Sequence, residues 1–298
     1  MSKKLLGILL SLVLAVSMLT ATALAAEGTV AEVDTAEKLA EAVAAGGEIK
    51  LTEDICLTEM VTIPAGKVVT IDLNGKVISG VSSAEAASCV INNKGFLTIN
   101  DTVGGGKITT EVQNPDLKDI PGYANNTINN GGILVVLGGT IENTGEGAAC
   151  YPIDTNSGSA NTKVTIKGGK IDASEESYAI RLWAGSTKYT NEVTIEGGEL
   201  SGYRAVWVHL PGNDATQAPY ASLTVNGGVL NSVDQTYNSA IYCRTWGQSY
   251  ANTSVTITGG TINGDVALSG PSSADVNPAE TVVISGGTFN SVNSGVYT

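Results

Sequence analysis

The chain has 298 residues, 16 Lys and Arg, 29 Asp and Glu and a formal net charge of −13 at pH 7, so we expect no nucleic-acid partner and no attraction to anionic membranes. Its 36 glycines and 15% charged residues, with abundant Val, Ile and Thr, indicate an all-β protein with many tight turns. Regular alternation of apolar residues along most of the chain excludes a disordered protein.

The N-terminus has the pattern of a secretory signal peptide. Two lysines precede an apolar run from Leu5 to about Leu19, and the triplet ALA at 23–25 is a small-x-small cleavage site. The apolar run is too short for a membrane span, and no cysteine lies at the cleavage point for a lipid anchor. We therefore expect residues 1–25 to be removed, and the mature protein to be secreted or held at the cell surface without membrane insertion.

Residues 26–47 are predicted to form an N-terminal segment and a capping helix. Asp34 and Glu37 have the spacing of a capping box, and Leu39 and Val43 lie on one apolar face. A pair of glycines then ends the helix. The apolar face predicts that this helix packs on the structure that follows it.

Residues 48–298 contain a tandem repeat. Six near-copies combine an alternating strand, a Gly-Gly pair and a second short strand, in LVVLGGTI, VTIKGGKI, VTIEGGEL, LTVNGGVL, VTITGGTI and VVISGGTF. Their second glycines recur every 27–32 residues, and looser members, GGGKI at 104–108 and VVTIDLNGKVI at 68–78, extend the pattern upstream. Self-similarity at this period is typical of a solenoid.

Each repeat also contains a third strand. Examples are SYAIRLW at 177–183, RAVWVHL at 204–210, SAIYCRTW at 239–246 and, more weakly, GAACYPI at 147–153. Three short strands cannot bury an apolar face alone, so the repeats stack and place equivalent residues such as Ile166, Ile195 and Val225 in columns. The predicted fold is an all-β, single-stranded, right-handed parallel β-helix of about eight coils with an N-terminal α-helical cap.

With these strands the chain resembles right-handed β-helix proteins of the pectin-lyase-like superfamily. AIRLW takes the place of the first sheet in that pattern, VTIEGG that of the second sheet and its tight turn, and EL that of the third. The resemblance spans roughly residues 48–298. It implies the fold more than the activity, since the superfamily includes lyases, hydrolases, esterases and non-catalytic adhesins. It also implies that polysaccharide binds along the sheet formed by the third strands.

Two asparagine pairs and the C-terminus give further expectations. Asn92-Asn93 and Asn129-Asn130 predict a short asparagine ladder inside a turn. The final stretch NSGVYT aligns with the third-strand position, and no capping, sorting or membrane motif follows it. We expect either end-to-end self-association of the last coil or, preferably, a truncated chain with a missing C-terminal module.

The third strands concentrate the rare side chains of a protein with 1 His, 3 Trp and three Arg. In 204–210 the aliphatic residues point into the coil, so Trp207 and His209 point outward. The same alternation in the neighbouring repeats predicts the outward columns Tyr151–Arg181–Trp207–Tyr242 and Trp183–His209–Arg244, with Trp246 also outward and Arg204 at the strand edge. These nine residues are the predicted ligand-binding residues.

Two interpretations of these side chains remain open. Flat rings offer apolar faces to sugar rings, while Arg, His and Tyr can hydrogen-bond to hydroxyls or carboxylates, so the residues form a binding platform. Alternatively they form a structural ladder, in which an exposed arginine stacked on a ring contributes about 0.5–1 kcal/mol. We favour an exported carbohydrate-binding or adhesin-type protein whose partner is a polysaccharide or surface glycan. A passive stalk of a larger surface protein is a further alternative.

We assign no catalytic residues. Glycoside hydrolysis needs two carboxylates about 5–10 Å apart, and the outward positions of residues 151–246 are predicted to carry no Asp or Glu. A polysaccharide (uronate) lyase on the same face is the alternative, with His209 or Tyr242 as base and Arg181 and Arg244 neutralising a uronate carboxylate. The sequence thus favours a protein that is not an enzyme, and a lyase rather than a hydrolase if it is one.

No metal or cofactor is expected. The four cysteines, Cys56, Cys89, Cys150 and Cys243, have no CxxC or metal-ligand spacing, and we expect buried free thiols. Ca²⁺ would suit so acidic a chain, but no GGxGxDx repeat supports it.

Overall fold

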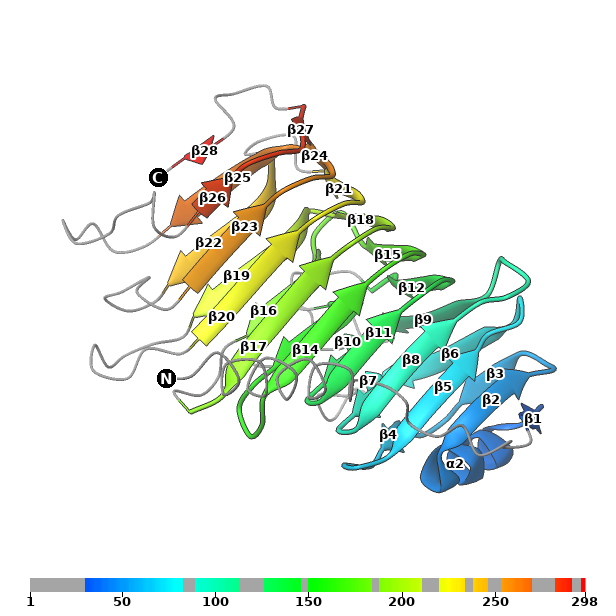
Figure 1. The fold of residues 1–298 in the computed structure, drawn as a ribbon. Helices are drawn as coiled ribbons and strands as arrows, with labels where there is room; N and C mark the ends of the chain where they lie inside the picture. Colours follow the sequence, from blue (N-terminus) through cyan, green and yellow to red (C-terminus); the bar gives the residue numbers. More distant parts are fainter. Residues whose placement is uncertain are drawn as a thin grey trace, which may run out of the picture. The chain divides into compact units, whose positions relative to one another are not determined.

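The computed structural model describes residues 30–82, 89–112, 126–145, 150–183, 188–210, 220–233, 238–245, 253–269, 282–290 and 296–297. The predicted signal peptide at 1–25 and Trp246 lie outside these residues. Residues 31–298 form one unit, an all-β parallel solenoid that begins with a short helix, as the sequence predicts (Figure 1).

The strands form three parallel sheets that the chain visits in turn. The first sheet contains β1 (Ala31–Val33), β2 (Gly47–Leu51), β5 (Val68–Asp72), β8 (Phe96–Asn100), β11 (Ile133–Val136), β14 (Thr162–Ile166), β17 (Thr190–Ile195), β20 (Tyr220–Val225), β23 (Thr253–Ile257) and β26 (Val282–Ile284). The second contains β3 (Ile55–Leu57), β6 (Val77–Ser82), β9 (Lys107–Val112), β12 (Thr140–Asn143), β15 (Lys170–Ala173), β18 (Glu199–Gly202), β21 (Val229–Ser232), β24 (Thr261–Asn263) and β27 (Thr288–Phe289). The third contains β4 (Val61–Ile63), β7 (Cys89–Asn93), β10 (Asn126–Asn130), β13 (Ile153–Asn156), β16 (Tyr178–Trp183), β19 (Arg204–Leu210), β22 (Ser239–Thr245), β25 (Asp265–Ser269) and β28 (Val296–Tyr297).

The predicted number of about eight coils is wrong. Within the described residues, the three sheets hold ten, nine and nine strands. The first coil, β2–β3–β4, has no Gly-Gly pair between its strands, so the repeat pattern could not identify it. Strand β1, which precedes the helix and pairs with β2, was not predicted either.

Helix α2 (Ala36–Ala45) packs against β2 and β4 through the predicted residues Leu39 and Val43, which are buried. The predicted N-terminal capping residue, Asp34, is wrong by one position. Thr35 has the extended backbone that a cap requires, and its hydroxyl accepts a hydrogen bond from the backbone N–H of Lys38 at 3.3 Å. Asp34 instead pairs with the Lys38 ammonium.

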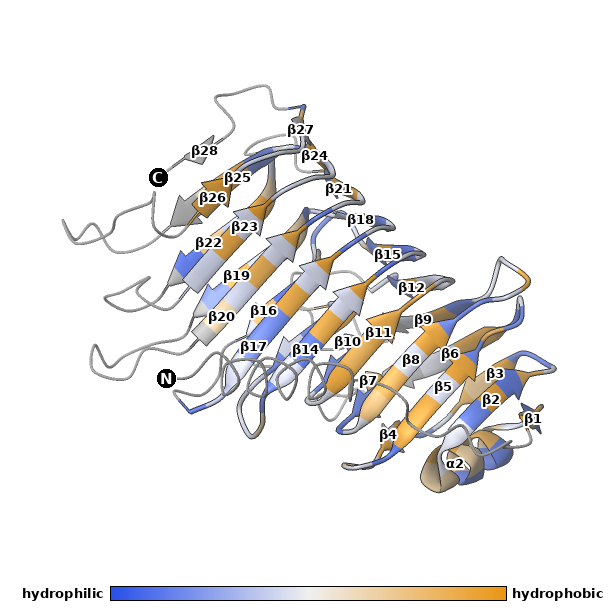
Figure 2. Cartoon of the chain, in the orientation of Figure 1, coloured by the Kyte–Doolittle hydropathy of each residue, from blue (hydrophilic) through white to orange (hydrophobic). Residues whose placement is uncertain are grey.

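The core consists of the predicted apolar columns. Ile166 pairs with Ile195, and Ile195 pairs with Val225, all with 0% exposure. Figure 2 shows the resulting apolar and polar bands along the strands of the first sheet. Apolar residues therefore continue from coil to coil inside the solenoid, and every second residue of a strand is left for the outer surface.

The Gly-Gly turns need both glycines for different reasons. The second glycine has a positive φ, as at Gly198 with +78°, which side chains other than glycine rarely adopt. The first glycine lies against the coil before it, and a Cβ on Gly197 would lie 2.4 Å from the carbonyl oxygen of Lys167. At this turn the close approach of the preceding coil thus leaves no room for a side chain on Gly197.

The predicted asparagine ladder is confirmed, and it is longer than expected. Asn93 Nδ2 donates to Asn130 Oδ1 at 2.7 Å, and Asn130 Nδ2 donates to Thr155 Oγ1 at 3.2 Å. Thr155 Oγ1 in turn donates to Asn191 Oδ1 at 3.1 Å. These four residues are buried where the chain passes from the third sheet to the first, and their hydrogen bonds offset the cost of burying them.

Candidate functional site

The third sheet brings together most of the residues predicted to bind ligand. Strand pairing places side chains of β16, β19 and β22 in two outward columns, Arg181–Trp207–Tyr242 and Trp183–His209–Arg244. Both columns agree with the prediction over these three coils. Residues in neighbouring coils are about 4.8 Å apart, so large side chains in one column contact one another.

The coil before β16 differs from the prediction. Asp154, not Tyr151, pairs in register with Arg181. Asp154 therefore extends the first column, and the prediction that the outward positions carry no Asp or Glu is wrong. The weak repeat GAACYPI has too little alternation to indicate the phase of its strand, which begins only at Ile153.

Asp154 and Arg181 form a bidentate ion pair. Arg181 Nε donates to Oδ1 at 2.8 Å, and Nη2 donates to Oδ2 at 2.5 Å. Burial acts to lower the pKa of Arg181, but the charge of Asp154 and its hydrogen bonds outweigh burial and raise that pKa. The guanidinium carbon lies 4.5 Å from the ring centroid of Tyr151 and 4.7 Å from that of Trp183. Tyr151 thus belongs to the site as a stacking partner of Arg181.

Six rings of this face pack into a continuous group, and Tyr242 joins it through the guanidinium of Arg204. We call these seven residues the aromatic cluster: Tyr151, Tyr178, Trp183, Tyr203, Trp207, His209 and Tyr242. Trp207 and His209 are stacked, with centroids 4.2 Å apart, and Trp183 meets His209 edge to face at 4.3 Å. Tyr178 lies 4.8 Å from Trp207. The prediction missed Tyr178, although its position at the start of β16, in register with Arg204, was the available signal.

The platform is less exposed than predicted. Tyr151, Arg204 and His209 are buried, with 3%, 7% and 4% of their surface exposed. The other described members of the prediction are half-buried: Arg181, Trp183, Trp207, Tyr242 and Arg244. A strand pattern predicts which side a residue points to, but these side chains are large enough to lean across one strand spacing and cover one another.

The environment of His209 keeps its ring uncharged. Burial, together with the positive charges of Arg181 and Arg244, lowers the pKa of His209 to about 3. Arg204 is held by neighbouring rings, with its guanidinium carbon 3.9 Å from the ring centroid of Tyr242 and 5.0 Å from that of Tyr203. The cluster is therefore a packed cationic and aromatic surface with a neutral histidine inside it.

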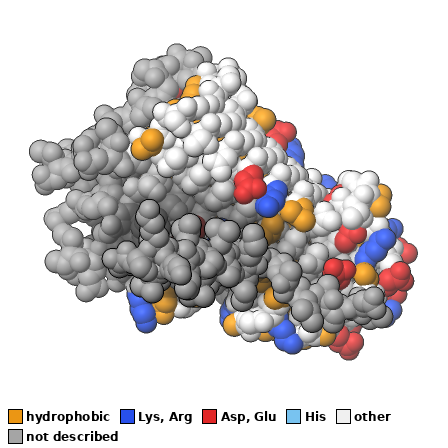
Figure 3. All heavy atoms as spheres, in the orientation of Figure 1, with side chains coloured by type: hydrophobic (Ala, Val, Ile, Leu, Met, Phe, Trp, Pro, Cys, Tyr) orange, Lys and Arg blue, Asp and Glu red, His pale blue; other side chains and the backbone are white. Residues whose placement is uncertain are grey.

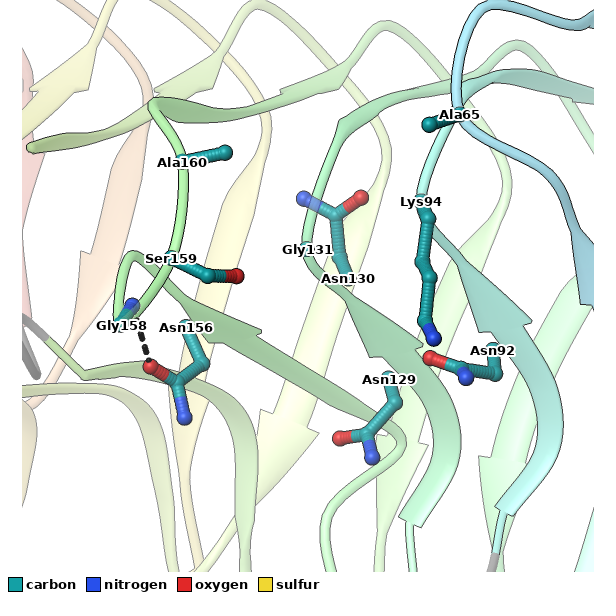
Figure 4. A pocket seen from close by; sticks show the side chains of 10 residues that line it. All are labelled: Ala65, Asn92, Lys94, Asn129, Asn130, Gly131, Asn156, Gly158, Ser159 and Ala160. Atoms are coloured by element: carbon teal, nitrogen blue, oxygen red, sulfur yellow. Dashed lines mark hydrogen bonds between the residues drawn. The ribbon is translucent and has the colours of Figure 1, made fainter.

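A pocket of about 380 Å³ lies beside the cluster, toward the N-terminal coils (Figure 4). Asn92 pairs with Asn129, and Asn129 pairs with Asp154, so the pocket continues the first outward column. Asn156, also at the pocket, pairs with Trp183 in the second column. The polar side chains that line the pocket are those of Asn92, Lys94, Asn129, Asn130, Asn156 and Ser159.

Sequence reasoning missed the pocket, although the two asparagine pairs were the signal. One asparagine of each pair turns inward and joins the ladder, whereas Asn92 and Asn129 turn outward and line the pocket. Small and medium-sized side chains, including Gly131, line the pocket, whereas the outward positions of the later coils carry the rings of Trp183, Trp207 and Tyr242. Its volume falls within the range of roughly 300–1,000 Å³ that is usual for small-ligand sites.

The charged side chains at this pocket differ from those on the side of the molecule drawn in Figure 3. On the side seen in Figure 3, acidic and basic side chains are interspersed over the described coils. Among the described residues that line the pocket, Lys94 is the charged one. The pocket is thus locally positive in a chain whose formal net charge is −13.

The cysteines and the described acidic residues form no further centre. The four cysteines are free thiols, and Cys56 is exposed, which corrects the expectation that all are buried. Within the described ranges, no three His, Cys, Asp or Glu residues gather as a metal site would require. No helix in the same ranges is long and apolar enough to cross a membrane.

Comparison of the chain with protein-family models, with curated proteins and with solved structures finds no match. The parallel solenoid, the aromatic cluster and the adjoining pocket are therefore the basis for a function.

Proposed function

We propose that this protein binds carbohydrate on the outer face of its third sheet. The observation that carries the proposal is the amide-lined pocket, which continues in register into the half-buried ring of Trp183. Side-chain amides hydrogen-bond to sugar oxygens, and an aromatic ring packs against the apolar face of a sugar. A polysaccharide or surface glycan would therefore lie across the coils, with one unit in the pocket and the next against Trp183.

In this proposal the residues of the predicted platform have two roles. The half-buried side chains of Trp183, Tyr242 and Arg244 contact the ligand directly. The buried ring of His209 packs against Trp183, and the buried guanidinium of Arg204 packs against Tyr242, so these two residues hold the contact side chains in place. The ligand-binding face therefore extends further toward the N-terminal coils than the rare side chains alone suggest.

We do not propose a uronate lyase. A general base works best with a pKa near the operating pH, whereas the pKa of His209 is about 3. Arg181, expected to neutralise a substrate carboxylate, is already paired with Asp154. The geometry thus supports binding better than catalysis.

Two further parts of the proposal rest on the sequence pattern. We propose that the solenoid is related to the pectin-lyase-like β-helices, which its three parallel sheets and tight Gly-Gly turns resemble. We also propose that the protein is exported and acts as an adhesin-type protein outside the cell or at its surface, because of the signal-peptide pattern at 1–25.

A glycan array tests the binding proposal. The mature protein should bind at least one class of glycan, and Trp183→Ala and Asn92→Ala should weaken that binding by about tenfold or more. Phe96→Ala is the matched control, since Phe96 is a half-buried, outward residue of the first sheet. A folded protein that binds no glycan on a broad array contradicts the proposal, as does equal binding by all three variants.

A further inference from the structure

We infer that the pocket is a subsite for an oxyanion, a carboxylate or sulfate group carried by the bound carbohydrate. This inference rests on the proposed function and names the chemical class that the pocket selects. It rests on the orientation of two amide side chains, those of Asn129 and Asn156 (Figure 4). Each orientation is fixed by a neighbouring group that can only donate or only accept a hydrogen bond.

The first amide is that of Asn129. An ionised carboxylate can only accept hydrogen bonds, so the atom of Asn126 that lies 3.2 Å from Asp154 Oδ2 is its donor nitrogen, Nδ2. The same Nδ2 donates to Asn129 Oδ1 at 2.9 Å. The carbonyl of Asn129 is thus used by Asn126, and its amino group donates one hydrogen bond toward the Cys89 sulfur and has a second N–H for a ligand. The Arg181–Asp154 ion pair therefore sets the polarity of the pocket through Asn126.

The second amide is that of Asn156. Its Oδ1 accepts a hydrogen bond from the backbone N–H of Gly158 at 2.8 Å, the contact drawn in Figure 4. A backbone N–H can only donate, so Asn156 also offers its amino group. Asn130, in contrast, uses both ends of its amide in the asparagine ladder, which leaves it a structural role.

Lys94 completes the set of donors. Its ammonium group has three donors and no acceptor, and its side chain is exposed at the pocket. The amides of Asn129 and Asn156 thus present amino groups, because their carbonyls are occupied within the protein, and Lys94 adds a positive charge. Asn92 and Ser159, which also line the pocket, can each donate and accept a hydrogen bond. An oxyanion only accepts, and its hydrogen bonds to these donors are charge-assisted.

Calorimetric titration with three oligosaccharides tests the inference. The ligands are a galacturonate tetrasaccharide, its fully methyl-esterified neutral form, and a sulfated galactan tetrasaccharide. At least one acidic ligand should bind about tenfold or more tightly than the neutral ester. The tighter of the two acidic ligands identifies the carboxylate or the sulfate as the preferred oxyanion.

The outcomes separate this inference from the proposed function. Equal affinity for the ester and both acidic ligands, or binding of neutral glycans alone, overturns the oxyanion inference and leaves carbohydrate binding standing. Failure to bind these three ligands and every glycan on the array overturns both.

Variants locate the effect in the pocket. Asn129→Asp replaces the free amino group by a negatively charged oxygen of the same shape and should weaken binding of the acidic ligand by about thirtyfold. Asn226→Asp adds the same charge in the turn that follows β20 and keeps the acceptor that Thr258 Oγ1 uses, so the affinity of this variant should stay within about twofold of wild type. Lys94→Gln changes an exposed side chain and should cost about tenfold without affecting folding.

Asn126→Ala tests the positioning role separately. Without Asn126 the amide of Asn129 is free to flip and present its carbonyl to the ligand. The ratio of the affinities for the acidic ligand and its ester should therefore decrease. If Asn129→Asp and Lys94→Gln bind the acidic ligand as tightly as Asn226→Asp does, the oxyanion inference is wrong.

Discussion

Removing Asp154 should destabilise the solenoid strongly. Only 5% of its side chain and 14% of that of Arg181 are exposed, so Asp154→Ala leaves a nearly buried guanidinium without its counter-charge. Breaking such a pair costs about 3–5 kcal/mol. The rings of Tyr151 and Trp183 remain stacked on the guanidinium and offset about 0.5–1 kcal/mol each, so we expect a loss of about 3 kcal/mol in the free energy of unfolding.

Urea denaturation of a double-mutant cycle checks this value. Arg181→Met removes the charge and keeps an apolar stem, so the Asp154→Ala/Arg181→Met double variant should be more stable than Asp154→Ala alone. A loss below about 1 kcal/mol in Asp154→Ala, or additive effects of the two substitutions, would falsify the view that the pair is buried and mutually dependent.

Two further predictions concern the turns and the histidine. Gly197→Ala places a Cβ 2.4 Å from a carbonyl oxygen of the preceding coil and should lower the free energy of unfolding by about 2–3 kcal/mol. Gly66→Ala, where φ is +78° and no atom lies within 4 Å of the new Cβ, should lower it by only about 1 kcal/mol. Similar losses for the two variants in urea denaturation would contradict the argument that the turns are limited by contact between coils. The pKa of His209 is lowered from 6.5 to about 3, so the unfolded chain binds the proton more readily, and this contribution to stability is present above pH 6.5 and is lost as the pH falls toward 3. The Tm of His209→Gln should therefore fall less than that of wild type between these pH values. Parallel curves of Tm against pH for the two proteins would refute this role of His209.

Local patterns were sufficient to predict the fold. Alternation within a strand decides which residues point inward, and the repeat decides which strands stack, so the column through Ile166, Ile195 and Val225 follows from the sequence. The same two rules place Arg181 next to Trp207 and Trp183 next to His209. Where the repeat is weak or has no Gly-Gly pair, as before β16 and in the first coil, the two rules do not show which residues point outward, and they do not place Asp154 in the outward column.

The site depended on contacts that no single strand contains. The burial of His209 results from rings in two neighbouring coils, and small and medium-sized side chains line the pocket, whereas later coils carry large rings. The polarity of Asn129 is decided by Asn126 and Asp154, which lie in different coils. The sequence by itself determined the solenoid and its outward columns, because periodicity is local. Only the tertiary structure decided which outward side chains are covered and which amide atoms face a ligand, because both depend on neighbours that meet only after the coils have stacked.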